Sequence, residues 1–476
     1  MIDSNKEVVS IDLNVKLLTP AWTGDANEKC KRIHETGIIG SLRWWFEVVA
    51  RGLGGSACSL DNHECSFDEQ KYRSIMKNSL DKMRALSKAG LCPASQVFGA
   101  TGWKKRFQLD ADSNELKEIM EESRFLPSTR PHNGNPGGWY ILPGMISVRD
   151  KRKDKHGTSK LSIRWSDKDE LNKNLLLAVF RLMENWTGVG AKTTNGYGVF
   201  KVENEPQVNL PGWNPFLDSQ NTIENKNGIL PELKDFFFSV IRFKPYDNWW
   251  KNFKEIQACL SKTVNIEGAT INISRRNPLT SDDAHKWLEH QCFPSSYIIR
   301  NWLRYSWSHH LGQGTESFIF GTAANDVCPQ CYERLFSKKS HCGVILTKEK
   351  ILSKVRSKIG LSHAYQQSGN ANDIWEFRLW GYLPGQGKLE HLKLKLKKNA
   401  GTGKGEDFQR EEFLENLQEA VLENGALWSS ADGFKAVGRC QGVVWREFNS
   451  SRDTVGLSSD PWEFFKSLVK GEGLCC

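Results

Sequence analysis

Two groups of cysteine and histidine residues have the types and spacing that metal binding requires. The first consists of Cys58, His63, Cys65 and Cys92, and the second of Cys328, Cys331, His341 and Cys342. Thiolates and imidazoles are the ligands that tetrahedral zinc prefers, and Cys328-Pro-Gln-Cys331 has the two-residue gap of a zinc knuckle. We therefore predict two structural zinc sites.

Both predicted sites leave an alternative open. In the first group, Ser95 stands where a knuckle would have its second cysteine, so His63 would supply the missing ligand. Buried free thiols are the alternative there. In the second group, the adjacent His341 and Cys342 seldom bind one ion together, so Cys292 is a candidate substitute. A redox pair is the alternative for that group, although no thioredoxin-like pattern surrounds it.

Several basic residues occur close to indole rings, a combination that suits nucleic acid. Arginine and lysine neutralise phosphates, and aromatic rings stack on bases. The predicted RNA-binding residues of this kind are Lys31, Arg32, Arg43, Trp44, Trp103, Lys104, Lys105, Arg106, Arg300 and Arg304. The alternative is that the tryptophans belong to the core and that the charges form a solvated surface.

A glycine-rich segment, residues 187–198, lies between a predicted helix and a predicted strand. This order is the reverse of that in Rossmann and P-loop sites, so the segment is not a dinucleotide fingerprint. Glycine lets backbone N–H groups approach phosphate closely, and short polar side chains add donors without bulk. The predicted RNA-binding residues here are Gly188, Gly190, Lys192, Thr193, Thr194, Asn195 and Gly196. An ordinary helix-to-strand connection is the alternative.

Motifs of common hydrolases are missing from the sequence. It contains no Gly-x-Ser-x-Gly, no His-Glu-x-x-His and no pair of carboxylates in a recognisable metal-nuclease setting. We therefore predict a protein that is not an enzyme and has no catalytic residues. His34, near Asp25, is the candidate base if the chain cleaves RNA instead.

Length and composition favour a two-domain protein of the cytoplasm. The 476 residues exceed the usual span of a single core, and the formal net charge of +9 suits partial contact with phosphate. No apolar run approaches the roughly 20 residues that a membrane-spanning helix needs. Residues 1–14 lack the apolar stretch of a signal peptide. We expect cytoplasmic localisation and no membrane partner.

The elements that would position these residues follow a similar order twice. Apolar periodicity predicts strands and helices, in chain order, at residues 9–17, 38–51, 139–148, 171–186 and 199–202, and again at 236–243, 297–310, 375–382 and 411–422. This order is typical of the ferredoxin-like split βαβ motif. We predict an α+β fold with two tandem ferredoxin-like, RRM-like domains at residues 1–205 and 231–476, the second degenerate and with helical insertions, joined by a linker at 206–230.

Four segments together resemble one family. They are Leu17-Leu-Thr-Pro-Ala-Trp-Thr-Gly24, Gly37-Ile-Ile-Gly-Ser-Leu-Arg-Trp-Trp45, Val97-Phe-Gly-Ala-Thr101 and the glycine-rich segment that ends in Asn195-Gly-Tyr-Gly198. The chain resembles the RAMP superfamily of CRISPR proteins, and within it the two-RAMP-domain subunits of type III-B Cmr complexes. The resemblance is specific over residues 9–200 and weaker over 233–330, where Arg300-Asn-Trp-Leu-Arg304 is a main support.

The resemblance implies a set of partners and a function. It implies packing against other RAMP subunits, and binding to the 3′ region of a guide CRISPR RNA and to the duplex of that guide with target RNA in antiviral defence. It also implies that other subunits cut the target. Two alternatives stay open, namely a RAMP-type, metal-independent RNA-processing endonuclease and a scaffold that contacts only proteins.

Overall fold

The computed structural model describes most of the chain. The described residues are 9–24, 30–58, 65–77, 82–119, 123–125, 139–150, 155–165, 169–217, 230–266, 269–274, 277–308, 319–320, 357–367, 373–385 and 409–474. His63 of the first predicted zinc site lies outside these residues. The whole second predicted zinc site, Cys328, Cys331, His341 and Cys342, also lies outside them.

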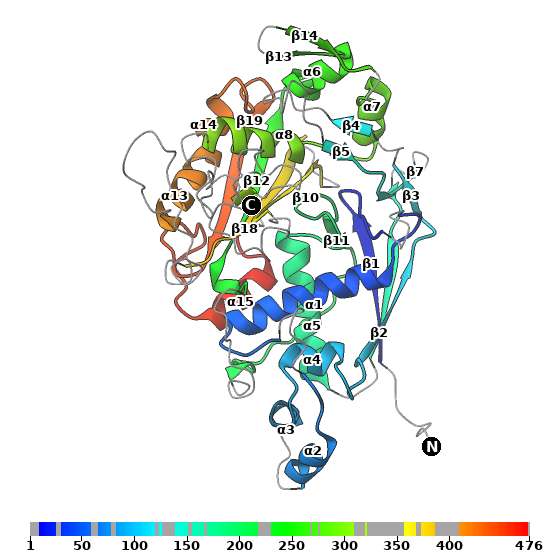
Figure 1. Ribbon diagram of the computed structural model, residues 1–476, viewed down its shortest axis with the longest axis vertical. Helices are drawn as coiled ribbons and strands as arrows, with labels where there is room; N and C mark the ends of the chain where they lie inside the picture. The colour runs from blue at the N-terminus through cyan, green and yellow to red at the C-terminus, as the bar shows by residue number, and fades with distance from the viewer. Residues whose placement is uncertain are drawn as a thin grey trace, which may run out of the picture.

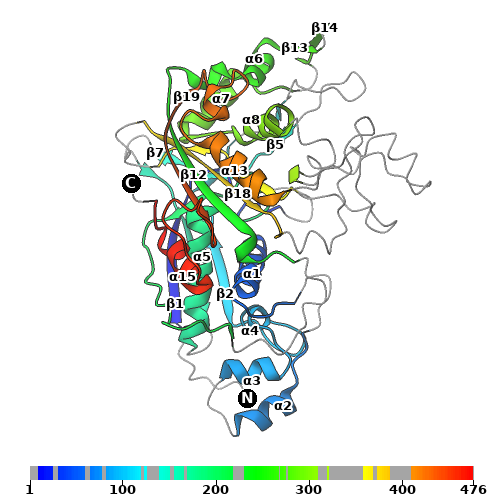
Figure 2. The same cartoon turned by 90° about the vertical axis from the view of Figure 1, so that its left-hand side faces the viewer.

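The first sheet consists of four strands, and helices α1 and α5 pack against it (Figure 2). Its strands are β1 (Val9–Leu17), β2 (Phe107–Asp112), β9 (Ser159–Trp165) and β11 (Phe200–Val202). Helix α1 (Glu35–Gly52) follows β1, and α5 (Glu170–Trp186) follows β9. The strand order is β11-β1-β9-β2 with all neighbours antiparallel, which is the ferredoxin-like arrangement. We call these six elements the first unit.

Local sequence patterns explain why these elements form where they do. In β1, the buried Leu13 and Val15 alternate with the exposed Asp12 and Asn14, as expected for a strand with one face in the core. Helix α5 begins after Asp169, whose carboxylate accepts a hydrogen bond from the free N–H of the first turn. The predicted elements at 9–17, 38–51, 171–186 and 199–202 are confirmed.

The predicted strand at 139–148 is confirmed in part, because the segment forms two short strands, but neither belongs to the four-stranded sheet. This segment forms β5 (Trp139–Ile141) and β6 (Met145–Ser147), which pair with β4 (Ser123–Phe125) and β3 (Leu116–Glu118) in separate two-stranded ladders. A third small ladder joins β7 (Arg149–Asp150) to β8 (Lys155–His156). The sheet is completed instead by β2 and β9, because β9 places its alternating Leu161, Ile163 and Trp165 in the core.

A helical excursion separates α1 from β2. It contains α2 (Glu69–Met76), α3 (Lys82–Lys88) and α4 (Pro93–Phe98). In both views α2 and α3 project from the lower end of the molecule, away from the two sheets (Figures 1 and 2). Strand β2 then returns the chain to the first sheet.

The second sheet repeats the arrangement of the first. Its strands are β12 (Phe236–Pro245), β16 (Ile359–Ser362), β18 (Trp375–Tyr382) and β19 (Gly438–Glu447), in the antiparallel order β16-β18-β12-β19. Helix α8 (Ser296–Asn301) follows β12, and α13 (Arg410–Val421) follows β18. Read from β19, the order is again fourth, first, third and second strand. The predicted α+β fold with tandem ferredoxin-like units is therefore confirmed.

The remaining elements surround this second unit. They are the 3₁₀ turns Leu233–Asp235 and Trp249–Asn252, α6 (Lys254–Ser261), β13 (Thr263–Ile266), β14 (Ala269–Asn272), α7 (Ser281–Glu289), β15 (Cys292–Phe293), β17 (Ala364–Tyr365), α14 (Ala426–Ser429) and α15 (Pro461–Lys470). Beyond α8 the chain continues as a π-helical segment, Trp302–Trp307. No helix in the described part of the chain is both long and apolar enough to cross a membrane.

One hydrophobic core runs through both units, because α1 and α5 lie between the two sheets (Figures 1 and 2). The ring of Trp45 in α1 lies 5.0 Å from that of Phe236 and 5.9 Å from that of Phe238 in β12. Trp186 in α5 also contacts Phe238, at 6.1 Å. The indole N–H of Trp186 donates to the carbonyl of Leu468 in α15 at 2.8 Å. The helices of the first unit are thus covered by the second.

Candidate nucleic-acid interface and metal site

The glycine-rich segment folds back against the chain that leaves β1. Positive φ angles occur at Gly190, Lys192, Gly196 and Gly198. At Gly190 a side chain is excluded, because its Cβ would lie 2.7 Å from the carbonyl oxygen of Trp22. The next N–H, that of Ala191, donates to the same carbonyl at 2.7 Å. This pairing leaves Ala191 and Lys192 exposed at the tip of the turn.

The second half of the segment is docked onto the second unit. Asn195–Gly196 forms the short strand β10, which pairs in parallel with β16 and so extends the second sheet. Ser296 in α8 donates its hydroxyl to the carbonyl of Asn195 at 2.6 Å. The guanidinium of Arg300 donates to the carbonyl of Thr194. These backbone acceptors therefore bind protein, and the exposed tip is the part of the segment that a ligand can reach.

The start of α1 lies beside this exposed tip. The hydroxyl of Thr23, next to Trp22, donates to the carbonyl of Arg32 at 3.2 Å and accepts from the N–H of His34 at 2.8 Å. Ser41 in α1 accepts from the N–H of Gly190 at 3.0 Å. Lys31 and Arg32 are exposed here. The structure thus brings three predicted RNA-binding residues, Lys31, Arg32 and Lys192, to the same edge of the first unit, beside a helix N-terminus that favours anions.

Arg43 and Trp44 lie further along α1 and are partly engaged by the protein. The Nε of Arg43 donates to Glu47 at 2.9 Å, and its Nη2 lies 3.9 Å from the Sγ of Cys58. The ring of Trp44 packs edge-on against that of Trp45 at 4.8 Å. Both side chains are half-buried. Their contacts in this structure are made within the protein, and their contact with RNA stays a prediction.

The basic turn at residues 103–106 is organised by its aromatic residue. The indole N–H of Trp103 donates to the carbonyl of Gln96 at 3.0 Å, and the guanidinium of Arg106 lies 3.9 Å from the centre of the indole ring. Lys104 and Lys105 are exposed. Because Arg106 covers the half-buried Trp103 ring, this turn offers mainly charged groups to a ligand.

Arg300 and Arg304, the candidates of the second unit, differ in exposure. Arg300 is only 3% exposed and donates to the carbonyl of Ile359 at 3.2 Å in addition to that of Thr194. Burial lowers the pKa of Arg300 to about 10. Arg304 is half-buried, with its guanidinium 5.2 Å from the ring of Tyr305. In this structure Arg300 positions the glycine-rich segment, whereas contact of either arginine with RNA stays a prediction.

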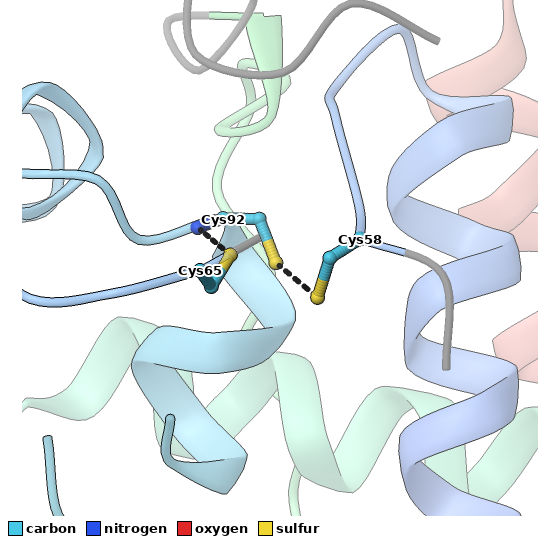
Figure 3. A group of neighbouring side chains, drawn as sticks. All are labelled: Cys58, Cys65 and Cys92. Atoms are coloured by element: carbon cyan, nitrogen blue, oxygen red, sulfur yellow. Dashed lines mark hydrogen bonds between the residues drawn. The ribbon is translucent and has the colours of Figure 1, made fainter. Parts of the chain in front are cut away.

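Three cysteines of the first predicted zinc site converge although they are far apart in the sequence. Cys58 follows α1, Cys65 precedes α2 and Cys92 opens α4, and all three are buried (Figure 3). Their sulfur atoms lie within 4.8 Å of one another, with 3.6 Å between those of Cys58 and Cys92. The hydroxyl of the fully buried Ser95 lies 3.6 Å from the Cys58 sulfur and 3.4 Å from that of Cys92.

This donor set fits a metal ion. Zinc–sulfur bonds of about 2.3 Å in a tetrahedron put neighbouring sulfurs about 3.8 Å apart, close to the separation found between Cys58 and Cys92. The pKa of Cys58 is lowered, chiefly because Cys65 and Cys92 hydrogen-bond to its sulfur. The same bonds to Cys58 raise the pKa of Cys65 and of Cys92. The three thiols therefore do not ionise equally easily without a cation, and a bound cation would favour ionisation of all three.

The first unit is the part of the chain that matches a known protein family. A model of the RAMP superfamily matches residues 14–201, which run from β1 into β11 and include the glycine-rich segment. Residues 14–201 belong to the RAMP superfamily. The RAMP domain therefore carries the exposed Lys192 tip, the basic turn and the cysteine cluster. Among curated proteins, no match to the chain is found.

Solved structures resemble the chain over most of its length at low identity. Cmr1 from Pyrococcus furiosus, in its apo form, is 11% identical over 80% of this chain and 89% of its own, with a TM-score of 0.31. A chain of the type III-B Cmr-beta complex bound to cognate target RNA and AMPPnP is 13% identical over 82% and 98%, with a TM-score of 0.33. A chain of Cmr-beta bound to cognate target RNA is 15% identical over 81% and 99%, with a TM-score of 0.30.

Some residues at this interface gave no signal in the sequence. Ser296 binds Asn195, and its oxygen also lies 2.9 Å from Nδ1 of His363, a fully buried side chain whose pKa burial lowers to about 3. At Gly196 a Cβ would lie 2.2 Å from this imidazole, which explains the glycine. These partners are 67 or more residues apart, so no local pattern could have joined them. In the sequence, Ser95 stands out only because it replaces the second cysteine of a zinc knuckle that would begin at Cys92.

Proposed function

We propose that this chain is a non-catalytic subunit of a cytoplasmic type III-B CRISPR ribonucleoprotein effector, acting in antiviral defence. It holds the 3′ region of the guide RNA and the guide–target duplex beside other RAMP subunits. One observation carries the proposal: the glycine-rich segment of a RAMP domain presents an exposed Lys192 beside Lys31 and Arg32. The four sequence segments that resemble RAMP subunits of Cmr complexes support the assignment to a type III-B assembly.

The contacts at this edge suit a phosphate backbone. Lysine and arginine bind phosphate oxygens, and such contacts position RNA without reading its sequence. Sequence recognition would then come from pairing between guide and target, as in other guided complexes. The chain's own task is to hold RNA in place.

Two further assignments belong to the same proposal. The chain is divided into a RAMP domain at residues 1–205, a linker at 206–230 and a second, degenerate RAMP domain at 231–476. A zinc ion held by Cys58, Cys65 and Cys92 would fix the root of the helical excursion, because Cys58 and Cys65 precede α2 and Cys92 follows α3. Its role is structural, since the cluster is buried.

The test is RNA binding by the purified chain over a series of salt concentrations. Replacing Lys31→Ala and Lys192→Ala together removes two proposed phosphate contacts, so the slope of log affinity against log salt should become shallower by about 1.4. The matched control, Lys244→Ala with Lys435→Ala, removes two exposed lysines of the second unit and should leave the slope unchanged. The RNA should stay intact.

Two results would contradict this proposal. Cleavage of the RNA, lost in a His34→Ala variant, would favour the RNA-processing nuclease, since His34 caps α1 beside the same tip. Absence of RNA binding at any salt concentration would favour a scaffold that contacts only proteins.

A further inference from the structure

The helical excursion carries most of the net charge of the chain. Residues 66–106 contain nine Lys and Arg against three Asp and Glu, a net +6, whereas the whole chain has a net +9. Within this span we define the basic lobe as α2, α3 and the turn at residues 101–106. Less than a tenth of the sequence length thus holds two thirds of the excess positive charge, which marks a local site for an anionic partner.

The described acidic side chains at the lobe, Asp68 and Glu69, bind groups of the lobe itself. Glu69 pairs with Arg73 at 2.6 Å, and the carboxylate of Asp68 accepts from the backbone N–H of Lys71 at 2.9 Å, which caps α2. Among the described residues, the exposed ammonium groups of Lys71, Lys88 and Lys104 have no ion-pair partner. Their charge is therefore available to a ligand.

The backbone brings these three lysines to one end of the lobe. The N–H of Phe67 donates to the carbonyl of Thr101 at 3.0 Å, and the N–H of Asp68 donates to that of Ala89 at 3.0 Å. Lys71 lies one helical turn after Asp68, Lys88 precedes Ala89, and Lys104 is three residues beyond Thr101. The rings of Phe67 and Trp103 pack against each other at 4.8 Å. Three segments that carry exposed lysines therefore meet at this end of the lobe.

Helix α2 contributes little to the core of the protein. No residue of α2 is buried, and α2 and α3 project away from both sheets in each view (Figures 1 and 2). A helix without a buried face gains little stability from the rest of the fold. In α3, Ala85 and Leu86 are buried. Cys65 precedes α2, Cys92 follows α3, and both lie in the buried cluster, which holds the two ends of this helix pair together.

We propose that the basic lobe is a second RNA-binding surface, which grips the sugar–phosphate backbone through Lys71, Lys88 and Lys104. This inference rests on the proposed function and extends it from the Lys192 tip to the basic lobe. The ligand is a phosphate backbone, since Arg106 covers the Trp103 ring and the exposed groups are lysines. Either a single strand or a duplex provides such a backbone.

The test compares two full-length triple variants. The lobe variant carries Lys71→Gln, Lys88→Gln and Lys104→Gln, and the control carries Lys244→Gln, Lys251→Gln and Lys435→Gln, which are exposed lysines of the second unit. Binding of a single-stranded RNA and of its duplex is measured over a salt series. Loss of three contacts should make the single-strand slope shallower by about 2 for the lobe variant alone. Whichever RNA, single strand or duplex, shows the larger change in salt slope is the form that the lobe binds.

The outcomes separate this inference from the proposed function. If the lobe variant keeps the wild-type slope while the Lys31 and Lys192 variant loses part of it, the lobe does not bind RNA and the proposed function stands. If the wild-type chain binds no RNA, both are overturned. Charge reversal at the same three positions, Lys71→Glu, Lys88→Glu and Lys104→Glu, should weaken binding further, and an unchanged affinity would also exclude the lobe. Unfolding temperatures check that these surface variants are folded.

Discussion

At the scale of single residues, the cysteine cluster is the part of the molecule with the most specific chemistry. Three sulfur atoms are assembled from positions 58, 65 and 92, and Ser95 places a hydroxyl beside two of them. Hydroxyl oxygen is a poorer zinc ligand than thiolate, so Ser95 leaves the protein part of the site short of a fourth strong donor. Because its side chain already lies beside two of the sulfur atoms, position 95 is where a fourth strong donor could be introduced.

We predict that the purified chain binds about one zinc ion at this cluster. Cys92→Ser should remove it, and a chelator should lower the unfolding temperature of the wild type by about 4 °C, for a loss of about 2 kcal/mol. Ser95→Cys should tighten metal binding, because it adds a fourth thiolate. Metal content after gel filtration and competition with a chromogenic chelator measure both effects.

The control for this prediction is Cys440→Ser, a buried cysteine of β19 that is not part of the cluster. It should retain the metal. Equal zinc content in Cys92→Ser and the wild type would show that the metal binds elsewhere in the chain.

At the scale of elements, the glycine-rich segment links the two units. Its exposed tip belongs to the RAMP domain, whereas β10 belongs to the second sheet and Arg300 in α8 binds the carbonyl between them. The position of the tip therefore depends on a helix more than 100 residues away in the sequence.

Arg300→Ala is expected to loosen this segment. The carbonyls of Thr194 and Ile359 would each lose one donor, while the N–H of Leu361 and the hydroxyl of Ser357 still donate to them, so the total cost should be about 1–3 kcal/mol. RNA affinity should fall, and the amide of His363, which donates to the carbonyl of Gly196 at 3.1 Å, should exchange faster with solvent. Hydrogen exchange and RNA titration measure the two effects.

Arg304→Ala, in the next turn of the same helical region, is the matched control and should leave that amide protected. Reduced RNA affinity in Arg300→Ala with unchanged exchange would instead mean that Arg300 touches RNA directly, and the positioning role would be abandoned.

At the scale of the whole molecule, the two units share one core. Trp45 and Trp186 of the RAMP domain are buried against β12, and the side-chain amide of Asn185 binds the last carbonyls of α15 at 3.0 and 3.1 Å. Helices that would face solvent in an isolated ferredoxin-like domain are here sandwiched between two sheets.

A fragment of residues 1–205 should therefore be unstable by itself. Exposing the two tryptophans alone would cost roughly 3–6 kcal/mol, a large part of the stability of an ordinary domain. We expect the fragment to aggregate or to unfold without a sharp transition, and co-expression with residues 231–476 to restore it. Calorimetry and gel filtration distinguish these states, and a monomeric fragment that unfolds cooperatively would show that the units are independent.

The sequence alone determined those elements whose apolar pattern is local. The periodicity of residues 9–17, 38–51 and 171–186 predicts β1, α1 and α5, because a strand or helix with one buried face repeats its apolar residues at a fixed short spacing. The four motif segments likewise indicated the RAMP superfamily, and the predicted set of Cys58, His63, Cys65 and Cys92 contains the three cysteines that the structure brings together. Residues 159–165, which form β9, carry the same kind of alternating pattern.

Only the tertiary structure decided which of these residues act together. It placed Ser95 in the cysteine cluster, buried Arg300 under the glycine-rich segment, set Arg43 beside Cys58, and brought the segments that carry Lys71, Lys88 and Lys104 together at the root of the lobe. Each of these arrangements joins segments that are far apart in the chain, and such contacts are fixed by the packing of the two sheets around α1 and α5. Local spacing carries no information about that packing, since it arises only when the whole chain closes its core.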